Sequence, residues 1–193
     1  MGGTTSNYAL RYPSETDAPD GATQIQNLAT DADAAILGAT QTQYVQPLFA
    51  RKSTDEGRAS TTTLANDTSL VLTGLKAGGI YEVAGIIVYD GGASTSAGNF
   101  KWNFSVPSGG SGGVYTYSRE NEGGTYTGAY PANWTDTETA NTTGVGTAMS
   151  VTIRGLLVVG SNGNLQFRWC QDTSKATNTH VLTNSYLSAR RVQ

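Results

Sequence analysis

Apolar residues occupy both sides of the segment Ile80–Asp90, which reads IYEVAGIIVYD. Its β-branched and aromatic residues, followed directly by Gly91-Gly92, predict a β-strand. Side chains alternate along a strand, so the residues form two apolar sets, interrupted only by Glu82. The sets are Ile80, Ala84, Ile86 and Val88 on one face, and Tyr81, Val83, Ile87 and Tyr89 on the other. An antiparallel strand with one wet face would alternate apolar and polar residues, so we expect both faces to be covered.

The first 50 residues have a different pattern, with one predicted helix over about 21–37. Asp20 is its candidate N-cap, and Ile25, Leu28 and Ala32 form an apolar stripe at three–four spacing. The stripe is narrow, so a helix of this length would be marginal without a partner. Two partners stay open: identical helices in a short parallel bundle, or the helix's own domain.

From Ser53 onward the pattern predicts only β-strands, separated by turns rich in Gly, Asn and Asp. The expected strands are Ser60–Leu64, Ser69–Gly74, Ile80–Asp90, Asn99–Val106, Val114–Ser118, Ala148–Val159, Leu165–Gln171 and Tyr186–Val192, with a possible short one at Thr179–Thr183. Asn162-Gly163 predicts a hairpin between its flanking strands. The sequence therefore predicts a mainly β protein. Its head, residues 51–193, is expected to be an antiparallel jelly-roll sandwich of about eight or nine strands. The segment 1–50, with the helix and a linker, precedes the head.

No helix is expected within the β region to cover the second face of Ile80–Asp90. Gly155–Val159 has the same two-sided apolar pattern. We therefore expect a subunit interface on the outside of this sheet, in a homotrimer that also suits the short helix. The expected interface residues are Ile25, Leu28 and Ala32 on the helix, and Tyr81, Val83, Ile87 and Tyr89 on the strand.

The composition favours an uncharged, turn-rich β protein, because only 14% of the 193 residues are charged and 24 are glycine. A net charge of −3 gives no electrostatic attraction to nucleic acid or an anionic membrane, so we expect neither as a partner. Cys170 is the only cysteine, which excludes a disulfide within the chain. No signal-peptide pattern or membrane-spanning apolar run is present, so we expect synthesis in a cytoplasm and no membrane insertion.

Few residues suggest catalysis, and we expect no enzyme activity, metal or cofactor. Ser111 fits the G-x-S-x-G pattern, but a nucleophile elbow needs a strand before the serine and a helix after it. His180 has no second His or Cys at ligand spacing. A cell-wall hydrolase remains as an alternative, with a catalytic acid pair among four carboxylates. These lie in predicted loops, where burial would not shift the pKa of either acid. These are Glu120, Glu122, Asp136 and Glu138.

The segment Tyr115–Thr143 has the composition best suited to ligand binding. Aromatic rings provide contact area at low entropic cost, and amides, hydroxyls and carboxylates provide adaptable hydrogen bonds. The same mixture suits the apolar faces and hydroxyl rims of sugars. The candidate ligand-binding residues are Tyr126, Tyr130, Trp134, Asp136 and Glu138. The alternative is that these aromatics only pin a long loop to the sandwich.

The N-terminal sequence ALRYPSETDAPDGATQIQNLATDADAAI resembles the start of minor tail and fibre-like proteins of actinobacteriophages. The sequences RKSTDEGRASTTTLANDTSLVL, YEVAGIIVYDGG and LQFRWCQDTSKATNTHVLTNSYLSARRV resemble the jelly-roll heads of the same proteins. Cys170 is a departure, because alanine is common after the tryptophan in that family. Such heads are similar in architecture to C1q- and TNF-like trimers.

The resemblance implies a virion protein, made in the host cytoplasm and attached to other tail or capsid proteins through its N-terminus. Tyr8, Leu10 and Tyr12 are the candidate attachment residues. The implied function is that of a minor tail or fibre protein whose head binds a host-surface glycan by avidity. The alternative is a capsid-decoration or head-fibre protein with a structural role and no specific receptor.

Overall fold

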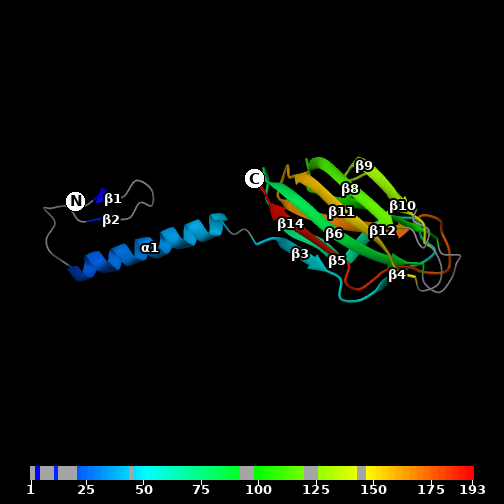
Figure 1. The fold of residues 1–193 in the computed structure, drawn as a ribbon, viewed down its shortest axis with the longest axis horizontal. Coiled ribbons are helices and arrows are strands. Elements are labelled where there is room, and N and C mark those ends of the chain that lie inside the picture. Colours follow the sequence, from blue (N-terminus) through cyan, green and yellow to red (C-terminus); the bar gives the residue numbers. More distant parts are fainter. Residues whose placement is uncertain are drawn as a thin grey trace. The chain divides into compact units, whose positions relative to one another are not determined.

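A computed structural model describes residues 3–4, 11–12, 21–43, 46–91, 98–119, 126–142 and 147–193 (Figure 1). The chain forms two compact units, the N-terminal unit Met1–Gln46 and the head unit Pro47–Gln193. The head begins before the expected boundary at residue 50, because strand β3 (Leu48–Arg51) pairs with strand β14 (Tyr186–Arg191).

The N-terminal unit contains a short two-stranded sheet and one helix. Strand β1 (Gly3–Thr4) pairs antiparallel with strand β2 (Arg11–Tyr12), and helix α1 spans Gly21–Gln43. The helix continues past the expected end at Leu37 and through Gly38, and no proline interrupts it.

The apolar stripe of α1 is open to solvent in the single chain. Ile25 is 71% exposed and Leu28 is 47% exposed, while Ala32 is half-buried. A partner helix would cover this stripe, and the bundle of identical helices stays a prediction.

The head unit is a sandwich of two antiparallel sheets. The smaller has the strand order β10-β7-β12-β5, and the larger has the order β3-β14-β6-β11-β8-β9, with β13 joining β6 to β4. The remaining strands are β4 (Glu56–Arg58), β5 (Ala65–Leu75), β6 (Ile80–Asp90), β7 (Phe100–Ser105), β8 (Ser111–Arg119), β9 (Tyr126–Asn133), β10 (Glu138–Ala140), β11 (Met149–Val158), β12 (Gly163–Gln171) and β13 (Thr179–Val181). The expected fold, a mainly β sandwich of the jelly-roll class with one helix, is confirmed.

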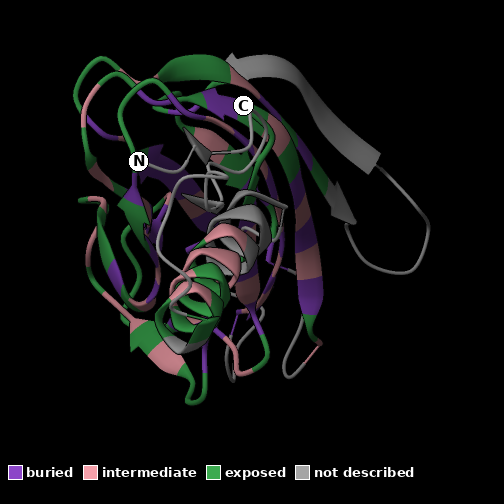
Figure 2. Ribbon diagram, turned by 90° about the vertical axis from the view of Figure 1, so that its left-hand side faces the viewer, coloured by how far each residue is buried: buried purple, intermediate pink, exposed green. Residues whose placement is uncertain are grey.

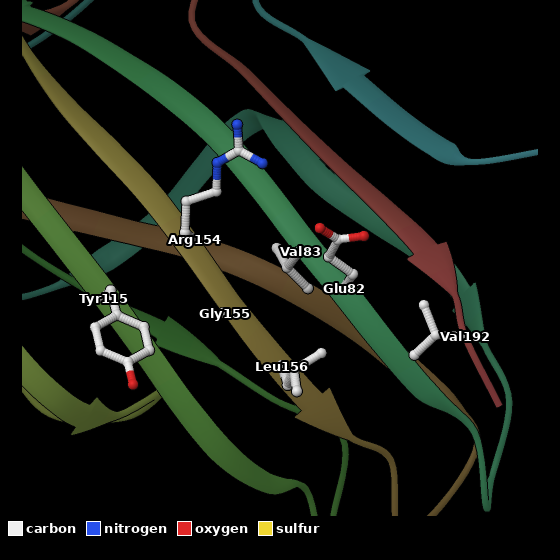
Figure 3. Close-up of a pocket in the computed structure, with 7 residues that line it drawn as sticks. All are labelled: Glu82, Val83, Tyr115, Arg154, Gly155, Leu156 and Val192. Atoms are coloured by element: carbon white, nitrogen blue, oxygen red, sulfur yellow. The ribbon is translucent and has the colours of Figure 1, made fainter.

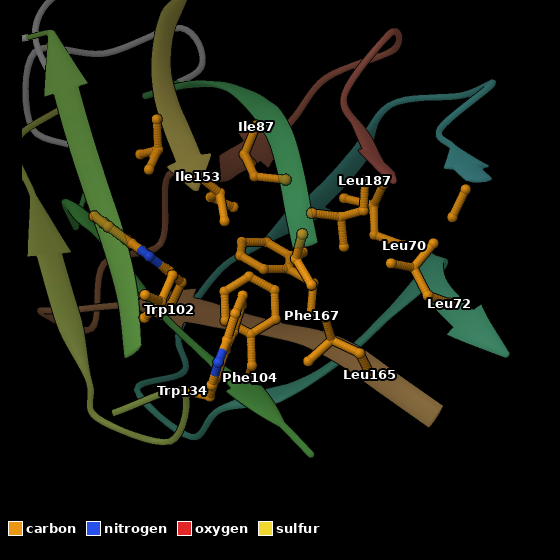
Figure 4. Packing of buried hydrophobic residues seen from close by; sticks show 14 of the residues in the cluster. Leu70, Leu72, Ile87, Trp102, Phe104, Trp134, Ile153, Leu165, Phe167 and Leu187 are labelled. Atoms are coloured by element: carbon orange, nitrogen blue, oxygen red, sulfur yellow. The ribbon is translucent and has the colours of Figure 1, made fainter. Parts of the chain in front are cut away.

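Aromatic side chains fill the space between the two sheets (Figure 4). Phe100 on β7 stacks on Tyr89 of the larger sheet, with ring centroids 4.5 Å apart, and on Trp102 at 5.1 Å. Phe104 meets Phe167 of β12 edge-on at 5.4 Å. Aromatic pairs in these geometries add to the free energy gained by burying the rings. Alternate residues of β7 therefore join the two sheets.

The prediction of a strand at Ser60–Leu64 was wrong, and the short strands β3, β4 and β10 were not predicted. Ser60–Leu64 is not a strand, and β4 lies just before it at Glu56–Arg58. Strand β9 was not predicted, because it contains Gly128 and Pro131, which lower β propensity. It lies at the end of the larger sheet, where proline is tolerated.

The Asn162-Gly163 turn does not close a hairpin. It follows β11 in the larger sheet and leads into β12 in the smaller sheet. The dipeptide specifies a tight turn, but it does not specify which strands pair on either side of it.

Strand β6 turns its tyrosine-containing set inward. Tyr81, Val83, Ile87 and Tyr89 are between 0% and 3% exposed and belong to the core of their own sandwich. The prediction that these four residues form the subunit interface is therefore wrong. The alternate residues of β6 are half-buried and face outward, and Figure 2 shows burial alternating along the strands. Glu82 is on this outward side, where its charge remains hydrated.

Candidate binding surface on the larger sheet

The outward side of the larger sheet carries a cluster of exposed apolar side chains. Tyr115 and Tyr117 on β8 are 51% and 46% exposed, and Leu156 on β11 is 52% exposed. We call this surface the outer face, and it comprises Phe49, Ile80, Glu82, Ala84, Ile86, Val88, Tyr115, Tyr117, Arg154, Leu156, Val158, Tyr186, Arg190 and Val192. Contiguous exposed apolar patches on protein surfaces mark sites of contact with other molecules.

The strand register places these side chains in continuous rows. Arg154 on β11 lies opposite Tyr115 on β8 and opposite Ala84 on β6. Leu156 lies opposite Glu82. Directly opposed residues on one face are close enough to pack together. The outer face therefore continues from β8 across β11 to β6, with the charged Arg154 between Tyr115 and Ala84.

Strands β14 and β3 extend the outer face beyond β6. The ring of Phe49 stacks on that of Tyr186 with centroids 5.9 Å apart. Arg190 donates a hydrogen bond from Nη2 to Oε2 of Glu82 at 2.7 Å. Both partners of this ion pair are exposed, so it contributes little stability, and it places charged groups within the outer face.

A hollow of about 310 Å³ lies in the outer face (Figure 3). It is lined by Glu82, Val83, Tyr115, Arg154, Gly155, Leu156 and Val192. Both a carboxylate and a guanidinium border an otherwise apolar depression. Such a surface can accept an apolar side chain from a partner and orient it with charged groups at the edge.

Trp134 lies beneath this hollow instead of in an exposed binding loop. The side chain is 2% exposed, and its Nε1 donates a hydrogen bond to the carbonyl oxygen of Leu156 at 3.1 Å. Its ring meets Phe104 edge-on at 5.2 Å. A side chain on Gly155 would approach the indole to 2.8 Å, so the glycine leaves the space that Trp134 fills. The prediction that Trp134 contacts a ligand directly is therefore wrong.

The other predicted ligand residues lie on strands and in a turn. Tyr126 and Tyr130 are on β9, and their side chains lie outside the described part of the chain. Asp136 closes the turn after β9, because its Oδ2 accepts a hydrogen bond from the Asn133 backbone N–H at 2.8 Å. Glu138 begins β10 and lies opposite Trp102. Tyr126–Asn133 and Glu138–Ala140 are therefore strands, although the segment after the expected strand Val114–Ser118 was expected to be a loop.

Burial raises the pKa of Glu138 above its ordinary value, and the nearby charge of Asp136 adds to the increase. We expected that burial would not shift the pKa of a carboxyl group in this segment. That expectation was wrong for Glu138, because it lies on a strand against the core. A raised pKa is one property of a general acid. Asp136, the nearby carboxylate, is already engaged in its turn.

The serine and histidine singled out in the sequence occupy ordinary strand positions. Ser111 begins β8, so a strand follows it and the nucleophile-elbow arrangement is not formed. His180 on β13 places Nδ1 2.9 Å from Oδ1 of Asp90. Within the described ranges, no group of three His, Cys, Asp or Glu residues could hold a metal ion. Those ranges also contain no helix that is long and apolar enough to cross a membrane.

The candidate attachment residues fall largely outside the described structure. Tyr8 and Leu10 lie outside it entirely. Tyr12 is in strand β2, where its backbone pairs with Gly3. Their role in attachment stays a prediction.

One buried charged cluster was not recognised in the sequence. Lys52 is 0% exposed and lies between two acids, Glu56 and Asp67. The guanidinium of Arg58 binds Glu56 and lies over the ring of Trp169, 4.1 Å from its centroid. The signal was the run of charged residues in RKSTDEGR next to predicted strands, which is also typical of a solvated loop.

Comparison with known proteins leaves the family open. No family model and no curated protein matches the chain. A solved structure described as that of infectious bursal disease virus, Gt strain, is similar over 76% of this chain, with 11% sequence identity and a TM-score of 0.19. This chain spans 41% of the length of that one. A likeness at this level carries no argument about fold or function.

Proposed function

We propose that this chain is a bacteriophage virion protein, a homotrimeric minor tail or fibre-like protein held by its N-terminal unit. The observation that carries the proposal is the outer face, with Tyr115, Tyr117 and Leu156 about half exposed on one sheet. Exposed apolar side chains gathered on one side of a sheet mark surfaces that contact other molecules. The sequence resemblance supports a place in a virion. The outer face supports assembly of several copies through this sheet.

The proposed subunit contact uses the outward side of β6 together with β11 and β8. Ile86, Leu156 and Val158 would be covered by neighbouring copies. The Glu82–Arg190 pair would lie within this contact, where charged groups fix the orientation of the partner. In the N-terminal unit, Ile25 and Leu28 of α1 would be covered by the helices of the other copies.

In this proposal the assembled heads bind a host-surface glycan through the end of the sandwich formed by β9 and β10. Tyr126 and Tyr130 of β9, with Asp136 and Glu138, are the proposed contacts. Three weak sites on one trimer, repeated over many trimers on a particle, give strong attachment by avidity. Catalysis has no part in this proposal.

The experiment is competition for adsorption. Purified protein is added to host cells before the phage, and unadsorbed particles are counted. We expect the fraction of free particles to rise with protein concentration, and antibodies against the head to label tails in electron micrographs. Unchanged adsorption at saturating protein, with labelling of capsids, would contradict the tail-fibre proposal.

A second function, capsid decoration without a receptor, is favoured by one observation. Trp134, the tryptophan of the proposed binding segment, is buried in the core at 2% exposure. Losing this ring weakens the analogy with aromatic sugar-binding sites. In that case the same labelling experiment would mark the head of the particle, and adsorption would be unaffected by added protein.

A further inference from the structure

The most unusual chemical feature of the head is a lysine that is fully buried between two carboxylates. Lys52 is 0% exposed and Asp67 on β5 is 2% exposed. The Lys52 Nζ lies 3.0 Å from Oδ1 and 2.8 Å from Oδ2 of Asp67, and 2.7 Å from Oε2 of Glu56. An amine this close to both oxygens of a carboxyl group also lies close to the carbon that joins them.

Backbone and indole N–H groups hold the Asp67 carboxyl in one orientation. Its Oδ1 accepts hydrogen bonds from the backbone N–H groups of Ser69 at 2.9 Å and Leu70 at 3.0 Å. Its Oδ2 accepts one from Nε1 of Trp169 at 3.0 Å. Trp169 is fully buried, so water is excluded on this side. Preorganised donors of this kind stabilise negative charge that develops on a carbonyl oxygen.

Glu56 is fixed against the same amine. Its Oε2 accepts hydrogen bonds from Lys52 Nζ and from Oγ1 of Thr68 at 2.8 Å, and its Oε1 accepts one from Nη2 of Arg58 at 2.6 Å. The carboxylate can therefore receive a proton from the amine without moving. A nucleophile, an electrophilic carbon and a proton acceptor are held together, and such proximity replaces a large part of a reaction barrier.

We propose that Lys52 and Asp67 become joined by an amide bond within the folded head, with Glu56 transferring the protons. Glu56 passes one proton from the Lys52 ammonium to Oδ2 of Asp67. The neutral amine then attacks Cγ of Asp67, and the Nζ–Cγ bond forms. The resulting oxyanion on Oδ1 is held by the N–H groups of Ser69 and Leu70. The Cγ–Oδ2 bond then breaks and Oδ2 leaves as water.

The reaction balances without an added reagent. The lysine ammonium gives up two protons, both of which leave on Oδ2, and Glu56 is ionised before and after the step. Nothing is oxidised or reduced. Trp169 acts as a positioning residue, because its N–H orients the departing oxygen.

Such a bond would link the segment after β3 to strand β5 in a chain that cannot form an internal disulfide, because Cys170 is its only cysteine. A covalent link closes a loop in the unfolded chain and so reduces the entropy gained on unfolding. This inference goes beyond the proposed function and does not rest on it.

The test is the intact mass of the full-length protein, measured after denaturation. We expect the wild-type mass to be lower than the sequence mass by one water. Trypsin should fail to cleave after Lys52 and should release residues 52–58 joined to residues 59–76, again less one water. Fragmentation of this branched peptide must place the link between Lys52 and Asp67.

Three variants make the result specific. Lys52→Arg and Glu56→Gln should both have their full sequence masses. Glu56→Gln retains the Lys52 amine and the Asp67 carboxyl group, so its full mass would show that Glu56 is needed for the reaction. Glu82→Gln, which alters the exposed carboxylate of the outer face, should still lack one water. Wild-type protein with its full sequence mass and normal cleavage after Lys52 would overturn the proposal and leave the cluster as an ion pair only.

Discussion

At the scale of single residues, the indole N–H groups of two buried tryptophans join segments that are distant in the sequence. Trp134 reaches from the turn after β9 into the core and bonds to the Leu156 carbonyl of β11. Trp169 of β12 bonds to Asp67 of β5. Each indole is almost fully buried and also satisfies its N–H, so it adds orientation to the apolar contact.

The first prediction concerns Trp134. Trp134→Ala should lower the free energy of unfolding by about 3–5 kcal/mol, the usual cost of removing a buried aromatic ring. Thr73→Ala is the control, because Thr73 is exposed on the smaller sheet, away from the outer face, and its loss should change the stability little. Urea unfolding of both variants measures the difference. Equal and small losses would show that Trp134 is not part of the core.

A second prediction at this scale concerns acid stability. Burial alone would raise the pKa of Glu56, but hydrogen bonds from Lys52, Arg58 and Thr68 lower it from 4.5 to about 2. The unfolded chain then takes up this proton more readily than the folded chain. The stability due to Glu56 is therefore present above pH 4.5 and is lost as the pH falls through about 2.

Urea unfolding between pH 7 and pH 2 tests this sign. Glu56→Gln cannot ionise, so its stability should fall less steeply than that of the wild type as the pH decreases below about 4.5. The hydrogen bonds from Arg58 and Thr68 remain whether or not Lys52 is joined to Asp67. Identical pH dependence of the two proteins would exclude a lowered Glu56 pKa in the folded state.

At the scale of elements, strand β6 determines which surface is inside and which is outside. Its two apolar sets differ by one residue in register, and a shift of one residue exchanges them. The structure commits the set with Tyr81 and Tyr89 to the core, and it leaves the set with Glu82 facing outward. The strand therefore belongs both to the core and to the surface proposed for assembly.

Adjacent residues of β6 provide a matched test of these two roles. Ile87→Asp places an unpaired charge in the core, where Ile87 is 0% exposed, and should destabilise the head by more than about 3 kcal/mol. Ile86→Asp changes the half-buried outward position and should leave a folded head that no longer assembles. Circular dichroism gives folding, and light scattering gives assembly. A folded Ile87→Asp protein would show that the two faces are assigned the wrong way round.

Part of the fold could be predicted from the sequence because its signals are local. The bounds of β6 follow from a run of β-branched and aromatic residues that ends at Gly91-Gly92. Both sets of β6 are apolar, so their hydrophobicity does not show which set faces the core. Glu82 is the one residue whose charge indicates the hydrated side. The burial of Trp134 depends on the space left by Gly155, and the Lys52–Asp67 contact depends on how the segment after β3 packs against β5. Such contacts between distant segments leave no periodic signal.

At the scale of the whole molecule, each unit carries apolar surface that a second copy could cover. In the N-terminal unit this is the stripe of α1 with Ile25 and Leu28, and in the head it is the outer face. Two independent contacts in one chain strengthen each other, because forming one raises the effective concentration for the other. The same reasoning makes a trimer of weak binding sites an effective attachment device.

The native mass of the purified protein in solution tests the central claim most directly. Light scattering coupled to size exclusion, at micromolar concentration, should give three times the chain mass of 20.2 kDa for the wild type. Leu156→Asp should give a folded species of 20.2 kDa, and Thr73→Asp, at an exposed position of the smaller sheet, should remain a trimer. Wild-type protein that runs at 20.2 kDa would contradict assembly through the outer face.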